Sequence, residues 1–84
     1  MKLVYYTRHA RNRMRLYEIV PDEVIEALAY PSLIQPGEHG RQHAWKTMQT
    51  GKTLRITFVE ESGRYVVITV TPKRFMPEGS SHEN

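Results

Sequence analysis

Hydrophobic residues recur with two different periods along the chain, and the change of period divides it into two halves. Between residues 8 and 30 the apolar positions lie three or four apart, which is the spacing of an amphipathic helix. From about residue 41 onward they alternate with polar positions, as in a strand with one buried face. The pattern predicts a helical N-terminal half and an antiparallel sheet in the C-terminal half.

The N-terminal half opens with a predicted strand at residues 2–6, which are rich in β-branched and aromatic side chains. Thr7 follows, and its hydroxyl can cap a first helix that we predict from about residue 8 to residue 17. A second helix is expected to begin at Val20-Pro21, because proline is favoured in a first helical turn. Pro31 should end it.

Three longer strands are predicted in the C-terminal half, at residues 41–49, 53–60 and 64–71, joined by tight turns into a meander. The loop before them, residues 32–40, can hold a short strand at Leu33-Ile34. A sheet this small is not stable alone, so both helices should cover one of its faces, and the first strand should join its edge. The predicted fold class is α+β, in the order β-α-α-β-β-β.

The alternation in the last two strands also assigns residues to the two faces of the sheet. We expect the helix-facing side to carry Leu54, Ile56, Phe58, Val66, Ile68 and Val70. We expect the opposite, open face to carry Arg55, Thr57, Tyr65, Thr69 and Thr71. His43 can line that open face, and Trp45 shares its parity but is expected in the core.

Length and composition limit the class of protein. The 84 residues form one domain at most, which we place at residues 1–75 with a polar, Pro/Gly/Ser-rich tail at 76–84. The lack of cysteine excludes a disulfide framework and a thiolate metal site, and it fits a reducing compartment. The apolar runs are too short to span a bilayer, and Arg8 arrives too early for a signal peptide. We therefore expect a cytoplasmic protein.

Charge is divided unevenly along the chain, although the net charge of +3 is mild. Arg8, Arg11, Arg13 and Arg15 crowd the first predicted helix, whereas carboxylates crowd the start of the second. This distribution can present a basic face to a polyanion such as RNA. The alternative is that the two segments simply pair with each other.

Two residues of the first helix have an unusual position. At about 100° per residue, its apolar stripe of Ala10, Met14 and Tyr17 turns inward, and His9 and Arg13 fall on the flank, where side chains are usually half buried. An imidazole there can move a proton, and a neighbouring guanidinium can hold a phosphate. The alternative is structural, with His9 bonded to a backbone carbonyl and Arg13 paired with a carboxylate of the second helix.

The run from Thr7 to Met14 has the form T-x-H-A-x-x-R-M, and it is followed by Gly40-Arg41 and a strand ending Val67-Ile68-Thr69-Val70. Over residues 3–72 this order resembles a family of bacterial domains related to the RelE/ParE toxin superfamily, including BrnT-type toxins. The resemblance implies two helices on an antiparallel sheet. It also implies an antitoxin partner, and either cleavage of mRNA without metal or inhibition of gyrase. By residue, His9, Arg13, Arg41 and Thr69 carry over.

The resemblance and the open face together give a candidate site for metal-free RNA cleavage. Such cleavage needs a base, a cation and an acid around one phosphate. The expected catalytic residues are His9, Arg13, Arg55, Tyr65 and Thr69. The expected RNA contacts are Arg8, Arg11, Arg41, Lys73 and Arg74. The alternative is a solvated polar face whose residues suit a strand.

No metal or other cofactor is expected. His39 and His43 are four residues apart, but on a strand that spacing is about 13 Å, which is too far to share a metal. The sequence thus favours a toxin-like, metal-free endoribonuclease with RNA and an antitoxin as partners. A non-catalytic binding module of the same fold and a housekeeping interaction domain remain as alternatives, because fold alone does not determine activity.

Overall fold

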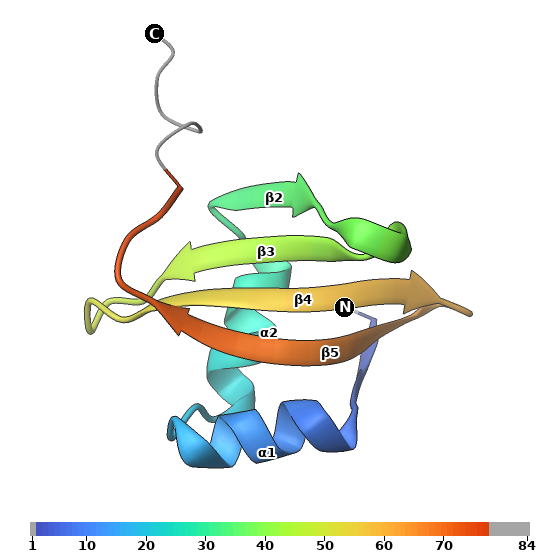
Figure 1. Ribbon diagram of the computed structural model, residues 1–84, viewed down its shortest axis with the longest axis horizontal. Helices are drawn as coiled ribbons and strands as arrows, with labels where there is room; N and C mark the ends of the chain where they lie inside the picture. The colour runs from blue at the N-terminus through green and yellow to red at the C-terminus, as the bar shows by residue number, and fades with distance from the viewer. Residues whose placement is uncertain (1, 78–84) are drawn as a thin grey trace, which may run out of the picture.

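The computed structural model describes residues 2–77, and its elements follow the predicted order with one short strand added (Figure 1). The helices are α1 (Arg8–Leu16) and α2 (Pro21–Ala29). The strands are β1 (Leu3–Tyr6), β2 (Leu33–Pro36), β3 (Gln42–Thr47), β4 (Thr53–Glu61) and β5 (Arg64–Lys73). A single turn of 3-10 helix, η1 (Glu38–Gly40), connects β2 to β3. Most of the predicted tail at 76–84 lies outside the described residues.

The five strands form one mixed sheet in the order β1-β5-β4-β3-β2. Four of the strands are antiparallel neighbours, as predicted, and β1 joins the edge as expected. The expectation of a wholly antiparallel sheet was wrong, because β1 pairs with β5 in parallel. The α1–α2 segment and the following meander carry the chain from β1 to β5, so no tight turn forces these two strands to be antiparallel.

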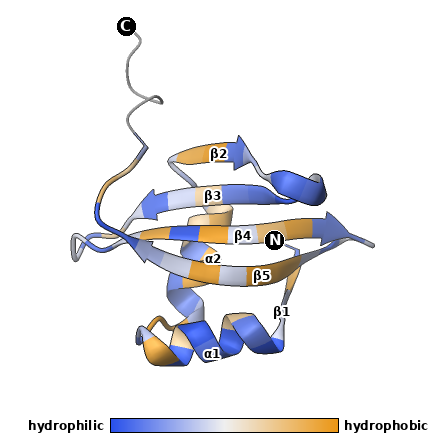
Figure 2. Ribbon diagram, viewed as in Figure 1, coloured by the Kyte–Doolittle hydropathy of each residue, from blue (hydrophilic) through white to orange (hydrophobic). Residues whose placement is uncertain are grey.

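The two helices cover different parts of the sheet. In Figure 1, α2 lies behind the strands and α1 runs along the edge of β5, beyond the end of β1. The contacts agree, since α2 touches β3 and β4 whereas α1 touches β5 and β1. Figure 2 shows that α1 is mostly hydrophilic along its visible side, so only a narrow stripe of it is buried. None of the helices within residues 2–77 is long and apolar enough to cross a membrane.

Thr7 fixes α1 against the sheet. Its side-chain oxygen accepts a hydrogen bond from the Ala10 amide at 3.0 Å, which is the predicted helix cap. The same hydroxyl donates to the carbonyl of Ile68 at 3.0 Å, and the Thr7 amide donates to the carbonyl of Val67 at 3.1 Å. One residue therefore ends β1, starts α1 and binds both to β5.

A β-bulge in β5 changes the face to which several residues belong. Thr57 pairs with Thr69 but Phe58 pairs with Val67, so Ile68 is an extra residue. Side chains alternate between the two faces along a strand, so one extra residue shifts this alternation. The residues of β5 before Ile68 therefore point to the face opposite to the one expected. The prediction that Val66 and Ile68 face the helices was wrong.

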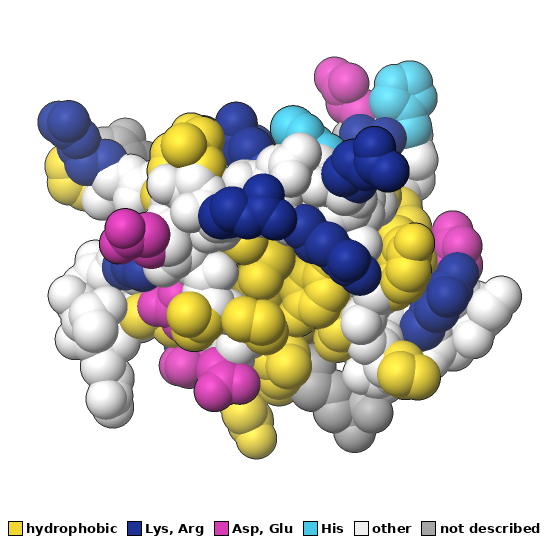
Figure 3. All heavy atoms as spheres, turned by 90° about the horizontal axis from the view of Figure 1, so that it is seen from below, with side chains coloured by type: hydrophobic (Ala, Val, Ile, Leu, Met, Phe, Trp, Pro, Cys, Tyr) yellow, Lys and Arg dark blue, Asp and Glu magenta, His cyan; other side chains and the backbone are white. Residues whose placement is uncertain are grey.

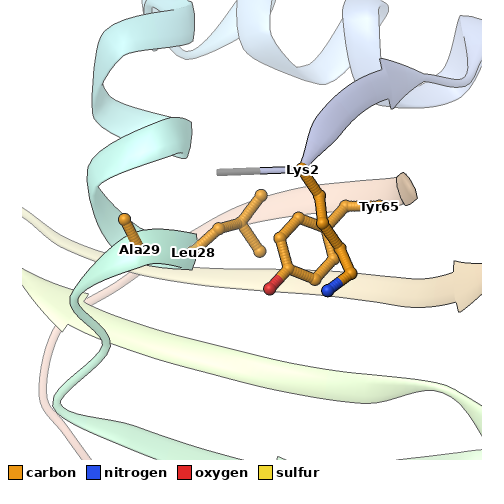
Figure 4. Close-up of a pocket in the computed structure, with 4 residues that line it drawn as sticks. All are labelled: Lys2, Leu28, Ala29 and Tyr65. Carbon is orange, nitrogen blue, oxygen red and sulfur yellow. The ribbon is translucent and has the colours of Figure 1, made fainter. Parts of the chain in front are cut away.

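Tyr65 was also assigned to the wrong face, for the same reason. It packs against the core, with its ring 5.3 Å from that of Phe58 in an edge-to-face arrangement. In Figure 4 it lies beside Lys2 and next to Leu28, and these residues line a hollow together with Ala29 of α2 on the helix-facing side of the sheet. Tyr65 is thereby removed from the candidate site.

The core joins both helices to one face of the sheet. Val24, Leu54, Ile56, Val67 and Val70 are its largest fully buried residues. Ala10 and Met14 of α1 join them, as the helical period predicts, but the expectation that Tyr17 belongs to the buried stripe was wrong, because it caps the end of the helix and is 37% exposed. Trp45 is also buried, but it lies outside this cluster, on the opposite face of the sheet.

Candidate functional site

The open face of the sheet carries a row of polar side chains that the strand register aligns. His43 on β3 pairs with Thr57 on β4, and Thr57 pairs with Thr69 on β5. Directly paired residues point to the same face, so these three side chains form one row across the sheet. A second row runs from Trp45 through Arg55 to Thr71.

A groove of about 610 Å³ lies over the first row. Its lining comes from the β2–β3 connection and from the open faces of β3, β4 and β5. The lining residues are Pro36, Gly37, Glu38, Arg41, His43, Arg55, Thr57 and Thr69. The chain turns sharply at this connection, where His39 and Gly40 both have positive φ. The groove therefore combines one imidazole, two guanidiniums, two hydroxyls and one carboxylate.

His43 is the titratable group at the centre of this groove. Its Nδ1 atom lies 2.8 Å from Oγ1 of Thr57, a buried hydroxyl. Desolvation by burial lowers the pKa of His43 below the usual 6.5, and repulsion from Arg55 and Lys73 lowers it further. A neutral imidazole near pH 7 is able to accept a proton.

Gly37 has no side chain, and this makes room for Nε2, the second ring nitrogen of His43. A Cβ atom at position 37 would lie 2.9 Å from Nε2 of His43 and 3.3 Å from its Cε1. The φ of Gly37 is −116°, which any residue can adopt. Glycine is therefore needed here because the imidazole comes so close to it, and not because of its backbone conformation.

Arg55 is held beside the groove by aromatic packing and by burial. Its guanidinium carbon lies 5.9 Å from the centroid of the Trp45 ring, whose Nε1 donates to Oε1 of Gln35 at 2.9 Å. The Nε atom of Arg55 is buried and has no hydrogen-bond partner among the described residues. Neither Arg55 nor Arg41 forms an ion pair within residues 2–77. The groove thus holds two guanidiniums that are not ion-paired among the described residues, beside the single carboxylate of Glu38.

The structure brings together only part of the site expected from sequence. Arg41, Arg55 and Thr69 line the groove, as expected, and Lys73 lies close enough to affect the pKa of His43. Arg74 follows β5 and is exposed. Among the expected residues, therefore, Arg41, Arg55 and Thr69 converge on one groove, whereas Tyr65 does not.

The two residues singled out on α1 lie elsewhere. His9 is exposed, so the expectation of a half-buried position was wrong for it, whereas Arg13 is partly buried as expected. The Arg13 guanidinium carbon lies 4.9 Å from the centroid of the Tyr17 ring, and its Nε is buried without a partner among residues 2–77. Arg13 does not pair with the second helix, where Glu23 binds Lys52 instead. Neither His9 nor Arg13 lines the groove over His43.

Arg8 and Arg11 line a separate hollow with Tyr5 and Tyr6, at the junction of β1 and α1. Figure 3 views the molecule from the α1 side and shows Lys and Arg side chains across the middle and along the upper edge of this face. Acidic side chains gather mostly toward its lower left. Basic side chains therefore gather on the side of the molecule that α1 forms.

Sequence reasoning did not identify His43, Thr57 and Gly37 as one site. Strand parity placed His43 and Thr57 on the open face, but the register between β3 and β4 was needed to make them partners. Nothing in the sequence distinguishes Gly37 from a turn glycine. Among the described residues, no cluster of three or more His, Cys, Asp or Glu side chains is arranged to hold a metal ion.

Comparisons with protein-family models, with curated proteins and with solved structures found no match to this chain. Function is therefore inferred from the residues of the open face and from the motif of α1. The structure shows a mixed five-stranded sheet with two helices. It also shows a groove lined by Arg41, Arg55 and His43, and the pKa of His43 is lowered by burial and by nearby positive charge.

Proposed function

We propose that this protein binds RNA on the open face of its sheet and cleaves it in the groove at His43, using its own side chains. The observation that carries the proposal is the position of His43. Its Nδ1 contacts Thr57, its pKa is lowered, and Arg41 and Arg55 line the same groove without carboxylate partners. These are the base and the cations that cleavage of a phosphodiester by the neighbouring 2′-hydroxyl requires.

In the proposed reaction, Nε2 of His43 takes the proton of the 2′-hydroxyl. This requires the tautomer in which Nδ1–H donates to Oγ1 of Thr57, since Nε2 then carries the free lone pair. The 2′-oxygen bonds to phosphorus, and the bond from phosphorus to the 5′-oxygen breaks. Arg41 and Arg55 stabilise the extra negative charge on the phosphate oxygens. Water in the open groove protonates the departing 5′-oxygen.

The biological role that we propose is that of a toxin-like ribonuclease with a protein antitoxin. Its support is the resemblance of the T-x-H-A-x-x-R-M run and the later strand motif to the RelE/ParE superfamily, together with the α+β class of fold. The site that we propose differs from the one that the resemblance implies, because it is centred on His43 and not on His9.

The second candidate function is a binding module of the same fold without catalysis. One observation favours it: His9 and Arg13, the two residues that the helix motif singles out, lie outside the groove. In that case the basic open face would bind an anionic partner, and His43 would take no part in chemistry.

An RNA cleavage assay in EDTA separates these functions. The wild-type protein should cleave a labelled single-stranded RNA and leave a cyclic phosphate, whereas His43→Ala should bind the same RNA and lose cleavage by about a hundredfold or more. His9→Ala is the matched control, an exposed histidine on α1 that should retain activity. Binding without cleavage by the wild type would favour the binding module, and equal cleavage by His43→Ala would remove the proposed site.

A further inference from the structure

A second, smaller hollow of about 310 Å³ is lined by Tyr5, Tyr6, Arg8 and Arg11. We propose that it is a subsite for a nucleotide that flanks the cleaved bond, so that the substrate is a single-stranded RNA several nucleotides long. This inference rests on the function proposed above and adds the form of the substrate to it. Three features support it: the chemistry of the residues that line the hollow, the distance of the hollow from His43, and the charges of Arg8 and Arg11, which the stability of α1 does not explain.

The aromatic part of the hollow is available to a base. Tyr5 pairs with Val66, whose partner Val59 belongs to the open face, so the Tyr5 ring lies on the same face as His43. It is 49% exposed, and the guanidinium carbon of Arg64 lies 5.2 Å from its centroid. Arg64 lies over one face of the ring, which leaves the other face as a platform on which an unpaired base can stack. Bases inside a duplex are already stacked and paired, which is why the proposal specifies a single strand.

The basic part of the hollow suits a phosphate. Arg8 and Arg11 are both exposed and form no ion pair with any residue between 2 and 77. They lie at the N-terminal end of α1, whose first turn contains no acidic residue. Positive charge there opposes the helix dipole, so helix stability does not account for either arginine. A guanidinium can instead hold a phosphate through two parallel hydrogen bonds.

Arg15 shows the contrast on the same helix. It lies in the last turn of α1, where the dipole favours a cation, and its Nη1 donates to Oδ1 of Asn12 at 3.3 Å. Arg15 therefore has a structural explanation that Arg8 and Arg11 lack. It does not line the hollow, which makes it a matched control.

The spacing of the two sites suits one strand of RNA. Three strand-to-strand steps separate β3, which carries His43, from β1, which carries Tyr5. With neighbouring strands about 4.8 Å apart, the two residues are separated by about 14 Å across the sheet. The step from Thr57 to Val59 on β4 adds about 7 Å along the strands, so the total is on the order of 15–20 Å. Thr57 and Thr69 lie along the path between them. An RNA placed in the groove at His43 would reach the hollow within a few nucleotides.

The test measures how affinity grows with RNA length. Fluorescence anisotropy gives Kd for oligoribonucleotides from two to six nucleotides, each carrying a 2′-deoxy group at the cleaved position to prevent reaction. For the wild type and for Arg15→Gln, lengthening should tighten binding by at least tenfold. The double variant Arg8→Gln/Arg11→Gln and the single variant Tyr5→Ala should lose that gain. Tyr5→Phe should keep it, because stacking needs only the ring.

The outcomes separate this inference from the proposed function. If the double variant binds the longest oligonucleotide as tightly as Arg15→Gln does, and the reactive RNA is still cleaved, the subsite is wrong and the proposed function stands. If the wild-type protein neither binds nor cleaves RNA, both are wrong. Annealing the oligonucleotide to its complement should weaken binding, and equal binding of the duplex would also overturn the inference. All of the arginine variants are at exposed positions, and matching melting curves would confirm that they fold.

Discussion

Nδ1 of His43 lies 2.8 Å from Oγ1 of Thr57, directly across the β3–β4 pair. Because this contact occupies one ring nitrogen, only Nε2 remains to exchange a proton with a ligand. The strand register fixes the relationship, and Thr57 is only 4% exposed, so the hydroxyl has little freedom to find another partner. The pairing of β3 with β4 therefore fixes the orientation of the imidazole.

The first prediction concerns this contact. Thr57→Val keeps the shape of the side chain and removes the hydroxyl, so Nδ1 loses its partner and the productive tautomer is no longer favoured. We expect RNA cleavage to fall at least about tenfold, a part of what a general base contributes. Thr57→Ser keeps the hydroxyl and should retain most activity. Equal rates for the valine variant and the wild type would show that Thr57 does not position His43.

The second prediction concerns pH. The pKa of His43 is lowered by burial and then by Arg55 and Lys73, so its ring should titrate below pH 6.5 in an NMR experiment. Cleavage requires the neutral ring and should therefore decline only as the pH falls through that lowered value. Arg55→Gln removes one repulsive charge, so the midpoint measured by NMR should move to higher pH. A midpoint at or above 6.5 in the wild type would contradict the burial of the ring.

The third prediction concerns the close approach of Gly37. Gly37→Ala places a methyl group 2.9 Å from Nε2 of His43, so the imidazole must shift or the nitrogen is covered. The φ of −116° suits alanine, and the new methyl group would also lie 3.3 Å from the carbonyl oxygen of Arg41, so we expect the melting temperature to fall by a few degrees. Cleavage should fall severalfold or more, as measured on the same RNA. Gly51→Ala tests the assay, because a Cβ there meets nothing within 4 Å and Gly51 does not line the groove, although its φ of +94° strains any residue with a side chain.

The fourth prediction concerns stability. Thr7→Ala removes the cap of α1 and the hydrogen bond to the Ile68 carbonyl, and it should lower the free energy of unfolding by about 0.5–2 kcal/mol in urea denaturation. Thr7→Ser retains the hydroxyl and should recover most of the loss. An unchanged unfolding midpoint in the alanine variant would mean that solvent replaces both contacts without cost.

The fifth prediction concerns the salt dependence of RNA binding. Arg41 lines the groove without an ion pair among the described residues, so Arg41→Gln should remove about one phosphate contact. The slope of log K against log salt should become flatter by about 0.7, the value for one contact with a single strand. Lys46→Gln is the control, since Lys46 is on β3 but pairs with Leu54 on the helix-facing side. Equal slopes for both variants would place the RNA elsewhere.

Local chemistry in the sequence was sufficient to predict the elements. The alternation from residue 53 to residue 60 predicted β4, and Thr7 predicted the start of α1, because a strand's parity and a helix cap depend only on near neighbours. The same local reasoning placed Arg55, Thr57 and Thr69 on the open face, and the structure agrees.

Long-range pairing decided what local patterns could not. The bulge at Ile68 lies where Thr7 binds the carbonyls of β5, and it moved Tyr65 from the open face to the core. The parallel pairing of β1 depends on the path of two helices and on no single residue. The partnership of His43 with Thr57 depends on the register between two strands. The sequence by itself determined which segments are helix or strand and which positions are polar. The tertiary structure decided which polar residues meet, because register, bulges and strand order arise from contacts between residues far apart in the chain.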